Sequence, residues 1–135
     1  MTKTDIINAV AFVTVPEGAR LDERNLPGTD PESGILISHI TGKDTGGIKI
    51  VSARMFAEQL TADAKGLDGT PDAAFFETVH KSTLEMNQYI IDGLTIPELE
   101  RTTIAEHKLM IARLQKIAQE LGITYSWPLD PLLAA

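Results

Sequence analysis

Hydrophobic and polar positions follow one pattern in the first part of the chain and another in the rest. Residues 1–52 carry short runs of β-branched residues separated by glycine and proline, whereas residues 53–122 are rich in helix-forming residues. Short β-branched runs between turn residues predict strands, and apolar residues that recur every three or four positions predict amphipathic helices. We therefore expect an α+β fold in which a small, mostly antiparallel sheet of about three strands precedes three helices. The length predicts one domain spanning residues 1–135.

The expected sheet consists of one strand at residues 6–15 and a β-hairpin further along the chain. Residues 6–15 are dense in Ile, Val and Phe and stop at Pro16, which favours a strand covered on both faces. A short helix that begins at Asp5 is the alternative. The segments GILISHIT and IKIVSA flank the glycine-rich GKDTGG and predict the hairpin. Residues 16–34 form a long loop rich in proline and glycine, and loops of this length are usually functional or mobile.

The helical part of the chain has clear start and stop signals. We expect helices at 53–64, from Thr70 to Gly93, and from Thr95 to Gly122. Serine or threonine precedes each start, where its hydroxyl accepts a hydrogen bond from the first turn, and glycine ends the second and third helices. A short connection between the last two predicts an antiparallel helical hairpin. In the last helix we expect a wide apolar stripe of Ile104, His107, Leu109, Met110, Ile111, Leu114, Ile117, Ala118 and Leu121.

Composition and charge remove several classes of function. The formal net charge of −7 repels phosphate backbones, so we do not expect a nucleic-acid partner. The chain has no cysteine, which excludes disulfides, zinc–thiolate sites and cysteine nucleophiles. No apolar run is long enough to span a membrane, and the N-terminus lacks the features of a signal peptide. We therefore expect a cytoplasmic protein, or a particle assembled in the cytoplasm.

The helical hairpin contains the one pattern that suggests a metal. His80 and His107 are equally far from a turn centred after Gly93, so antiparallel pairing places both rings at one level, about 20 Å from the turn. Glu77 stands three residues before His80, and Glu-x-x-His is the pairing that carboxylate-bridged bundles use to bind metals. A metal site of Glu77, His80 and His107 is therefore one hypothesis. Flanking histidines at a helix–helix boundary are the structural alternative, and we favour it.

Other chemical motifs fail on their spacing. The segment TGKDTGG lacks the first glycine and the Ser or Thr of a phosphate-binding loop, and a strand is expected to follow it. Ser38 and His39 are adjacent and would point to opposite faces of a strand, so they cannot form a nucleophile–base pair. We expect no catalytic residues and no cofactor.

The C-terminal segment 123–135, ITYSWPLDPLLAA, is unusually apolar for a chain end. A segment of this kind is not left free in water, so it either folds back over the helical hairpin or binds another protein. We expect it to fold back. If it binds a partner, the contact residues are Trp127, Leu129, Leu132 and Leu133.

These patterns predict a non-enzymatic subunit for protein–protein interaction or assembly. It binds a protein partner or itself, as a homo-oligomer, and by analogy could be a structural component of a larger particle such as a virion. Two alternatives stay open: a metal-dependent enzyme or metal sensor that uses the His/Glu site, and a small acidic regulator that binds a basic partner. The sequence resembles no family that would choose between them.

Overall fold

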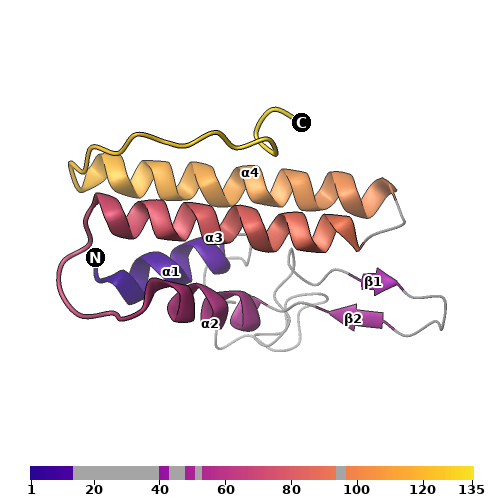
Figure 1. Cartoon of the computed structure of the whole chain (residues 1–135), viewed down its shortest axis with the longest axis horizontal. Helices are drawn as coiled ribbons and strands as arrows, with labels where there is room; N and C mark the ends of the chain where they lie inside the picture. Colours follow the sequence, from indigo (N-terminus) through magenta and orange to yellow (C-terminus); the bar gives the residue numbers. More distant parts are fainter. Residues whose placement is uncertain (14–39, 43–47, 51–52, 94–96) are drawn as a thin grey trace.

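The structure is a computed structural model that describes residues 1–13, 40–42, 48–50, 53–93 and 97–135. Four helices form its body: α1 (Lys3–Ala11), α2 (Ala53–Ala64), α3 (Ala73–Asp92) and α4 (Pro97–Glu120). Helices α3 and α4 run side by side along the long axis, and α1 and α2 lie against them (Figure 1). Contacts join α1 to α2, α2 to α3, α3 to α4 and α4 to α1, so the helices close into a ring around one core.

The prediction of an α+β fold is wrong for the part of the chain that the structure describes. No three-stranded sheet is present there, and the body is helical. The strand pairing it contains is a short antiparallel ladder between β1 (Ile40–Gly42) and β2 (Ile48–Ile50), in the register Ile40↔Ile50. This ladder lies inside the segment expected to form a hairpin, but it forms no layer of the fold. The loop at 16–34 and the rest of the hairpin lie outside the described residues.

The strand expected at residues 6–15 is wrong for its described part, and the alternative of a short helix is correct: residues 6–11 belong to helix α1, which begins at Lys3 and not at Asp5. A capping box begins the helix: the Thr2 hydroxyl accepts from the Asp5 N–H at 3.1 Å, and the Asp5 carboxylate accepts from the Thr2 N–H at 3.0 Å. These bonds satisfy backbone donors that a helix start leaves open. Ile6, Ile7 and Val10 are then buried on one face of the helix. Capping and burial together outweigh the strand preference of the β-branched residues, because that preference is small beside tertiary packing.

The three predicted helices are present, with shifts at their ends. Helix α2 has the expected bounds. Helix α3 begins two residues later than expected, because Asp72 is the N-cap and its carboxylate accepts from the Phe75 N–H at 2.9 Å. The proposed cap at Thr95 lies outside the described residues. At the other end of α4, Gly122 has a φ of +69° and forms a Schellman motif, in which the Ile123 N–H donates to the Ala118 carbonyl at 2.9 Å.

The core lies between the four helices and is rich in aliphatic and phenylalanine side chains. Phe56, Leu60, Phe76, Met110 and Leu114 are almost completely buried. The expected stripe on α4 is partly wrong, because Leu109 and Leu121 are exposed at 50% and 39%. Thr103 and Glu106 take part in the buried face in their place. Within the described helices, none is both long and apolar enough to cross a bilayer.

Candidate functional site

Two features of the described surface and interior are candidates for function: a buried polar network and an open groove. The network joins α3, α4 and the C-terminal segment 123–135, which runs back along the helical hairpin (Figure 1). The groove lies between α2 and α3. The network contains both histidines of the metal hypothesis.

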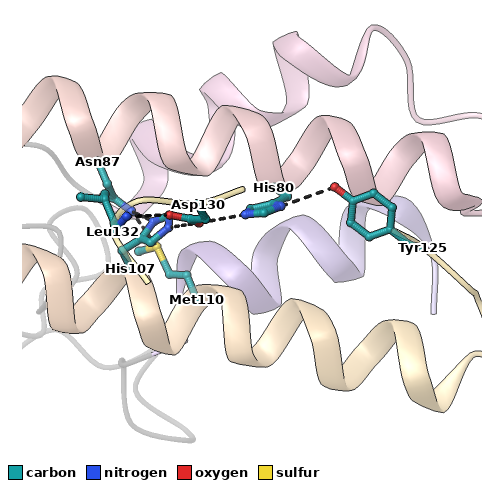
Figure 2. A network of polar contacts seen from close by, with 7 residues as sticks. All are labelled: His80, Asn87, His107, Met110, Tyr125, Asp130 and Leu132. Carbon is teal, nitrogen blue, oxygen red and sulfur yellow. Dashed lines mark hydrogen bonds and ion pairs between the residues drawn. The ribbon is translucent and has the colours of Figure 1, made fainter. Parts of the chain in front are cut away.

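One carboxylate oxygen is shared by two imidazole rings at the centre of the network. The Oδ2 atom of Asp130 is 2.8 Å from Nε2 of His80 on α3 and 2.6 Å from Nε2 of His107 on α4 (Figure 2). The other carboxylate oxygen, Oδ1, accepts from the Leu132 N–H at 3.0 Å. Both histidines are fully buried and Asp130 is 6% exposed. A buried carboxylate needs such donors, since removing a charge from water is otherwise costly.

The outer nitrogen of each ring also has a hydrogen-bond partner. Nδ1 of His107 lies 2.9 Å from the amide nitrogen of Asn87, whose second contact is the Met110 sulfur at 3.7 Å. Nδ1 of His80 lies 3.4 Å from the Tyr125 hydroxyl. An amide nitrogen can only donate, so Nδ1 of His107 accepts and its Nε2 carries the proton that bonds Asp130. His107 is therefore the neutral tautomer with hydrogen on Nε2.

The environment shifts the titration of three groups in the network. Burial lowers the pKa of His107, and the hydrogen bond and negative charge of Asp130 only partly oppose this. Burial acts to raise the pKa of Asp130, but the hydrogen bonds from His107 and His80 outweigh it, so that pKa lies below its usual value. Burial, with the charge of Glu77, raises the pKa of Tyr125 to about 12. The network therefore holds an ionised aspartate and a neutral His107 near pH 7.

An aromatic cluster covers the His80 end of the network. The Trp127 ring centre lies 5.3 Å from that of His80 and 4.3 Å from that of Tyr125. The Trp127 and Tyr125 rings pack edge to face, an arrangement that aromatic pairs favour. Trp127 is half-buried as a result, and Leu132, at the other end of the segment, is 6% exposed.

The predicted partner-binding residues all belong to the C-terminal segment 123–135. The segment 123–135 folds back on the hairpin, as expected, and uses Trp127 and Leu132 within the chain. Leu129, at 90% exposure, and Leu133, at 37%, face solvent. Partner binding through Trp127, Leu129, Leu132 and Leu133 stays a prediction, and Leu129 and Leu133 are the two of the four that are exposed.

The structure brings together two of the three predicted metal ligands. His80 and His107 meet at Asp130, at one level of the hairpin as their spacing indicates, whereas Glu77 is exposed. Among the described residues, no three His, Cys, Asp or Glu side chains form a group that could hold a metal ion. Metal binding by Glu77, His80 and His107 stays a prediction, and hydrogen bonding to Asp130 accounts for the meeting of the two rings.

Sequence reasoning missed Asp130, Asn87 and Tyr125. A signal for Asp130 was present, because it is the only charged residue in the apolar segment 123–135. Once that segment folds back, its lone carboxylate has to meet a donor. No comparable signal marks Asn87 or Tyr125, which are ordinary residues for a helix and for a chain end.

The second candidate is the α2–α3 groove, an open depression of about 500 Å³ between the two helices. Its floor contains Phe56 and Ile90, which are buried, and its mouth carries Met55 and Tyr89, exposed at 53% and 80%. The full lining is Met55, Phe56, Gln59, Asp63, Ser82, Glu85, Met86, Tyr89 and Ile90. An exposed tyrosine beside methionines on an open groove is typical of a protein-binding surface.

Comparison of the chain with family models, curated proteins and solved structures found no match.

Proposed function

We propose that this protein is a non-enzymatic interaction subunit that binds a protein partner through the α2–α3 groove. The observation that carries the proposal is the exposure of Tyr89, at 80%, and of Met55, at 53%, at the mouth of the groove. Tyrosine is enriched among the residues that dominate binding energy at protein interfaces, and methionine adapts its shape to a partner. In the isolated chain these two side chains expose apolar area to water, and that area contributes nothing to the stability of the fold.

The buried network supports the non-enzymatic part of the proposal. A general acid or base has to reach the substrate by a hydrogen bond. All four ring nitrogens of His80 and His107 already contact protein groups, and both rings are closed to solvent. Their role in this arrangement is to fix the C-terminal segment to α3 and α4. A well-packed helical body with a fixed chain end is a suitable support for a binding surface.

Site-specific crosslinking tests the proposal. A photoreactive benzoylphenylalanine replaces Tyr89 in the groove or, as a control, Gln119, which is exposed on α4. We expect illumination in the source cell to give a discrete crosslinked protein from position 89 and not from position 119. The crosslinked protein is then purified, and its affinity for the subunit should fall about tenfold or more in Tyr89→Ala, or about 1.4 kcal/mol. Equal products from both positions, or an unchanged affinity, would contradict the proposal.

The mass of the native protein in solution tests the self-association that the sequence suggested. A homo-oligomer should show a multiple of the chain mass of 14.7 kDa at micromolar concentration. An isolated chain that gains mass only when a second protein is present would instead indicate a hetero-complex. Cytoplasmic location remains an expectation from the sequence.

A further inference from the structure

The α2–α3 groove has the form of a seat for a helix. Its α2 wall is Met55, Gln59 and Asp63, each four residues apart, and its α3 wall includes Glu85 and Tyr89 at the same spacing. Residues at this spacing line one side of a helix, so each helix contributes one row of side chains to the groove. The lining covers eight steps on each helix, from 55 to 63 and from 82 to 90, which is about 12 Å by the helical rise. About two turns of a third helix fit that length.

The charge of the groove selects the partner. Asp63 and Glu85 line it, and none of the described residues in its lining is Lys or Arg. Beyond the Glu85 and Tyr89 wall, a neighbouring depression adds Asp92. Asp63 accepts a hydrogen bond from the Gln59 amide at 2.9 Å, and Asp92 accepts one from the Gln88 amide at 2.9 Å. Because these donors are uncharged, the bonds hold both carboxylates in place without neutralising their negative charge. The net charge of −7 adds to this negative potential.

A second copy of the chain is a poor occupant for the same reason. In a two-fold symmetric contact centred on the groove, each groove would face an identical groove. That contact would set Asp63 and Glu85 of one chain against the same carboxylates of the other, and like charges brought together in an interface are costly. The favoured occupant carries the opposite charge.

We infer that the groove binds a basic amphipathic helix of a partner protein. This inference rests on the proposed function and names its partner. The apolar side of the incoming helix contacts Met55, Met86 and Tyr89, and its Lys or Arg side chains contact Asp63 and Glu85. Helix-in-groove recognition uses apolar anchors at helical spacing, and charges at the rim set the orientation and the rate of association.

A model peptide tests the inference directly. The probe is a fluorescent peptide of about 14 residues in which Leu and Lys recur at helical spacing, and the control probe has Glu in place of Lys. Fluorescence anisotropy measures binding of each to the full chain. We expect the Leu/Lys peptide to bind, the Leu/Glu peptide not to bind, and the affinity to fall as salt rises from about 50 to about 500 mM.

Matched variants locate the binding site. Glu85→Lys in the groove and Glu120→Lys at the end of α4 change the net charge equally, and both positions are exposed. Tyr89→Ala is compared with Leu109→Ala, an exposed apolar residue on α4. We expect each groove variant to weaken binding of the Leu/Lys peptide about tenfold or more, and each control to change it less than about twofold. Circular dichroism verifies that each variant is folded.

Three results would overturn the inference. They are no binding of the Leu/Lys peptide up to about 1 mM, equal weakening by Glu85→Lys and Glu120→Lys, and tighter binding of the Leu/Glu peptide. The first would mean that the groove does not seat a basic helix, and the second that the net charge alone attracts the peptide. If crosslinking from position 89 still yields a partner, the proposed function stands and only the nature of its partner is wrong.

Discussion

Replacing Asp130 with alanine should detach the C-terminal segment and greatly destabilise the protein. The carboxylate accepts from three donors: Nε2 of His80, Nε2 of His107 and the backbone N–H of Leu132. Asp130→Ala leaves all three donors without this acceptor at a place where the two rings are fully buried.

The expected loss of stability is large because Asp130 is a buried charged residue. Removing one partner of a buried ionic or charge-assisted pair typically costs about 3–5 kcal/mol. Each abandoned buried donor costs about 1–3 kcal/mol by itself, so three donors cost about 3–9 kcal/mol, and water that enters to accept their bonds reduces this total. A domain is stable by only about 5–15 kcal/mol, so the variant should be close to unfolding. Leu129→Ala is the control: Leu129 is 90% exposed in the same segment, and we expect a change below about 0.5 kcal/mol.

Urea denaturation with two probes measures the effect. Far-UV circular dichroism follows the helices, and fluorescence of Trp127, the only tryptophan, follows the docked segment. In Asp130→Ala we expect the tryptophan emission to move to longer wavelength before the helices unfold. A double-mutant cycle with His107→Gln should show non-additivity of about 1 kcal/mol or more, because the two side chains share one bond. A destabilisation below about 1 kcal/mol, with unchanged tryptophan emission, would refute the reasoning.

Three further predictions concern pH and backbone conformation. The pKa of His107 in the folded protein lies below its ordinary 6.5, so the stability that depends on neutral His107 is fully present above about pH 6.5 and is lost as the pH falls towards the folded pKa. The lowered pKa of Asp130 adds a further loss of stability below about pH 4. Thermal denaturation at pH 7, 6 and 5 checks this against His107→Gln, whose profile should be flatter, and equal slopes would count against the protonation state assigned to His107. The pKa of Tyr125 is raised to about 12, so the protein should lose stability only above about pH 10, where tyrosine ionises in the unfolded state. Absorbance of the phenolate in a Tyr89→Phe variant measures the ionisation of Tyr125, and a midpoint near pH 10 in the folded protein would contradict this prediction. Gly122→Ala should cost about 1 kcal/mol, because its φ of +69° disfavours a side chain, whereas Gly93→Ala, at a φ of −91°, should change stability little; equal effects in denaturation would disprove this explanation.

The helical half of the fold was predictable because its signals are local and agree with one another. Helix α2 has the bounds that its apolar spacing predicts, and Gly122 ends the last helix through the left-handed conformation that glycine favours. For residues 6–11 the same reasoning left a strand and a short helix open and favoured the strand, which was wrong. The Ile and Val residues of this segment favour a strand locally, and its helix depends on the Thr2 and Asp5 capping box and on burial against other helices.

The candidate site was predictable only in part, for a similar reason. Equal spacing from the turn indicates that His80 and His107 meet, since this follows from the geometry of a hairpin. Asp130 reaches them from a non-helical segment, where no periodicity fixes the direction of a side chain. The α2–α3 groove depends on which faces of two helices remain uncovered, and a single sequence does not specify that. The acidic charge on which the proposed partner depends was nevertheless visible in the composition.

Methyl NMR of the four methionines tests the central claim, that the protein binds a partner through the α2–α3 groove, most directly. Met55 and Met86 line the groove, Met110 is buried beside Asn87 in the network, and Met1 is exposed at the N-terminus. The methyl groups are labelled with ¹³C, and the purified crosslinked partner or the Leu/Lys peptide is added. We expect the signals of Met55 and Met86 to shift while those of Met110 and Met1 stay in place. Shifts confined to Met110 or Met1, with Met55 and Met86 unchanged, would contradict the account.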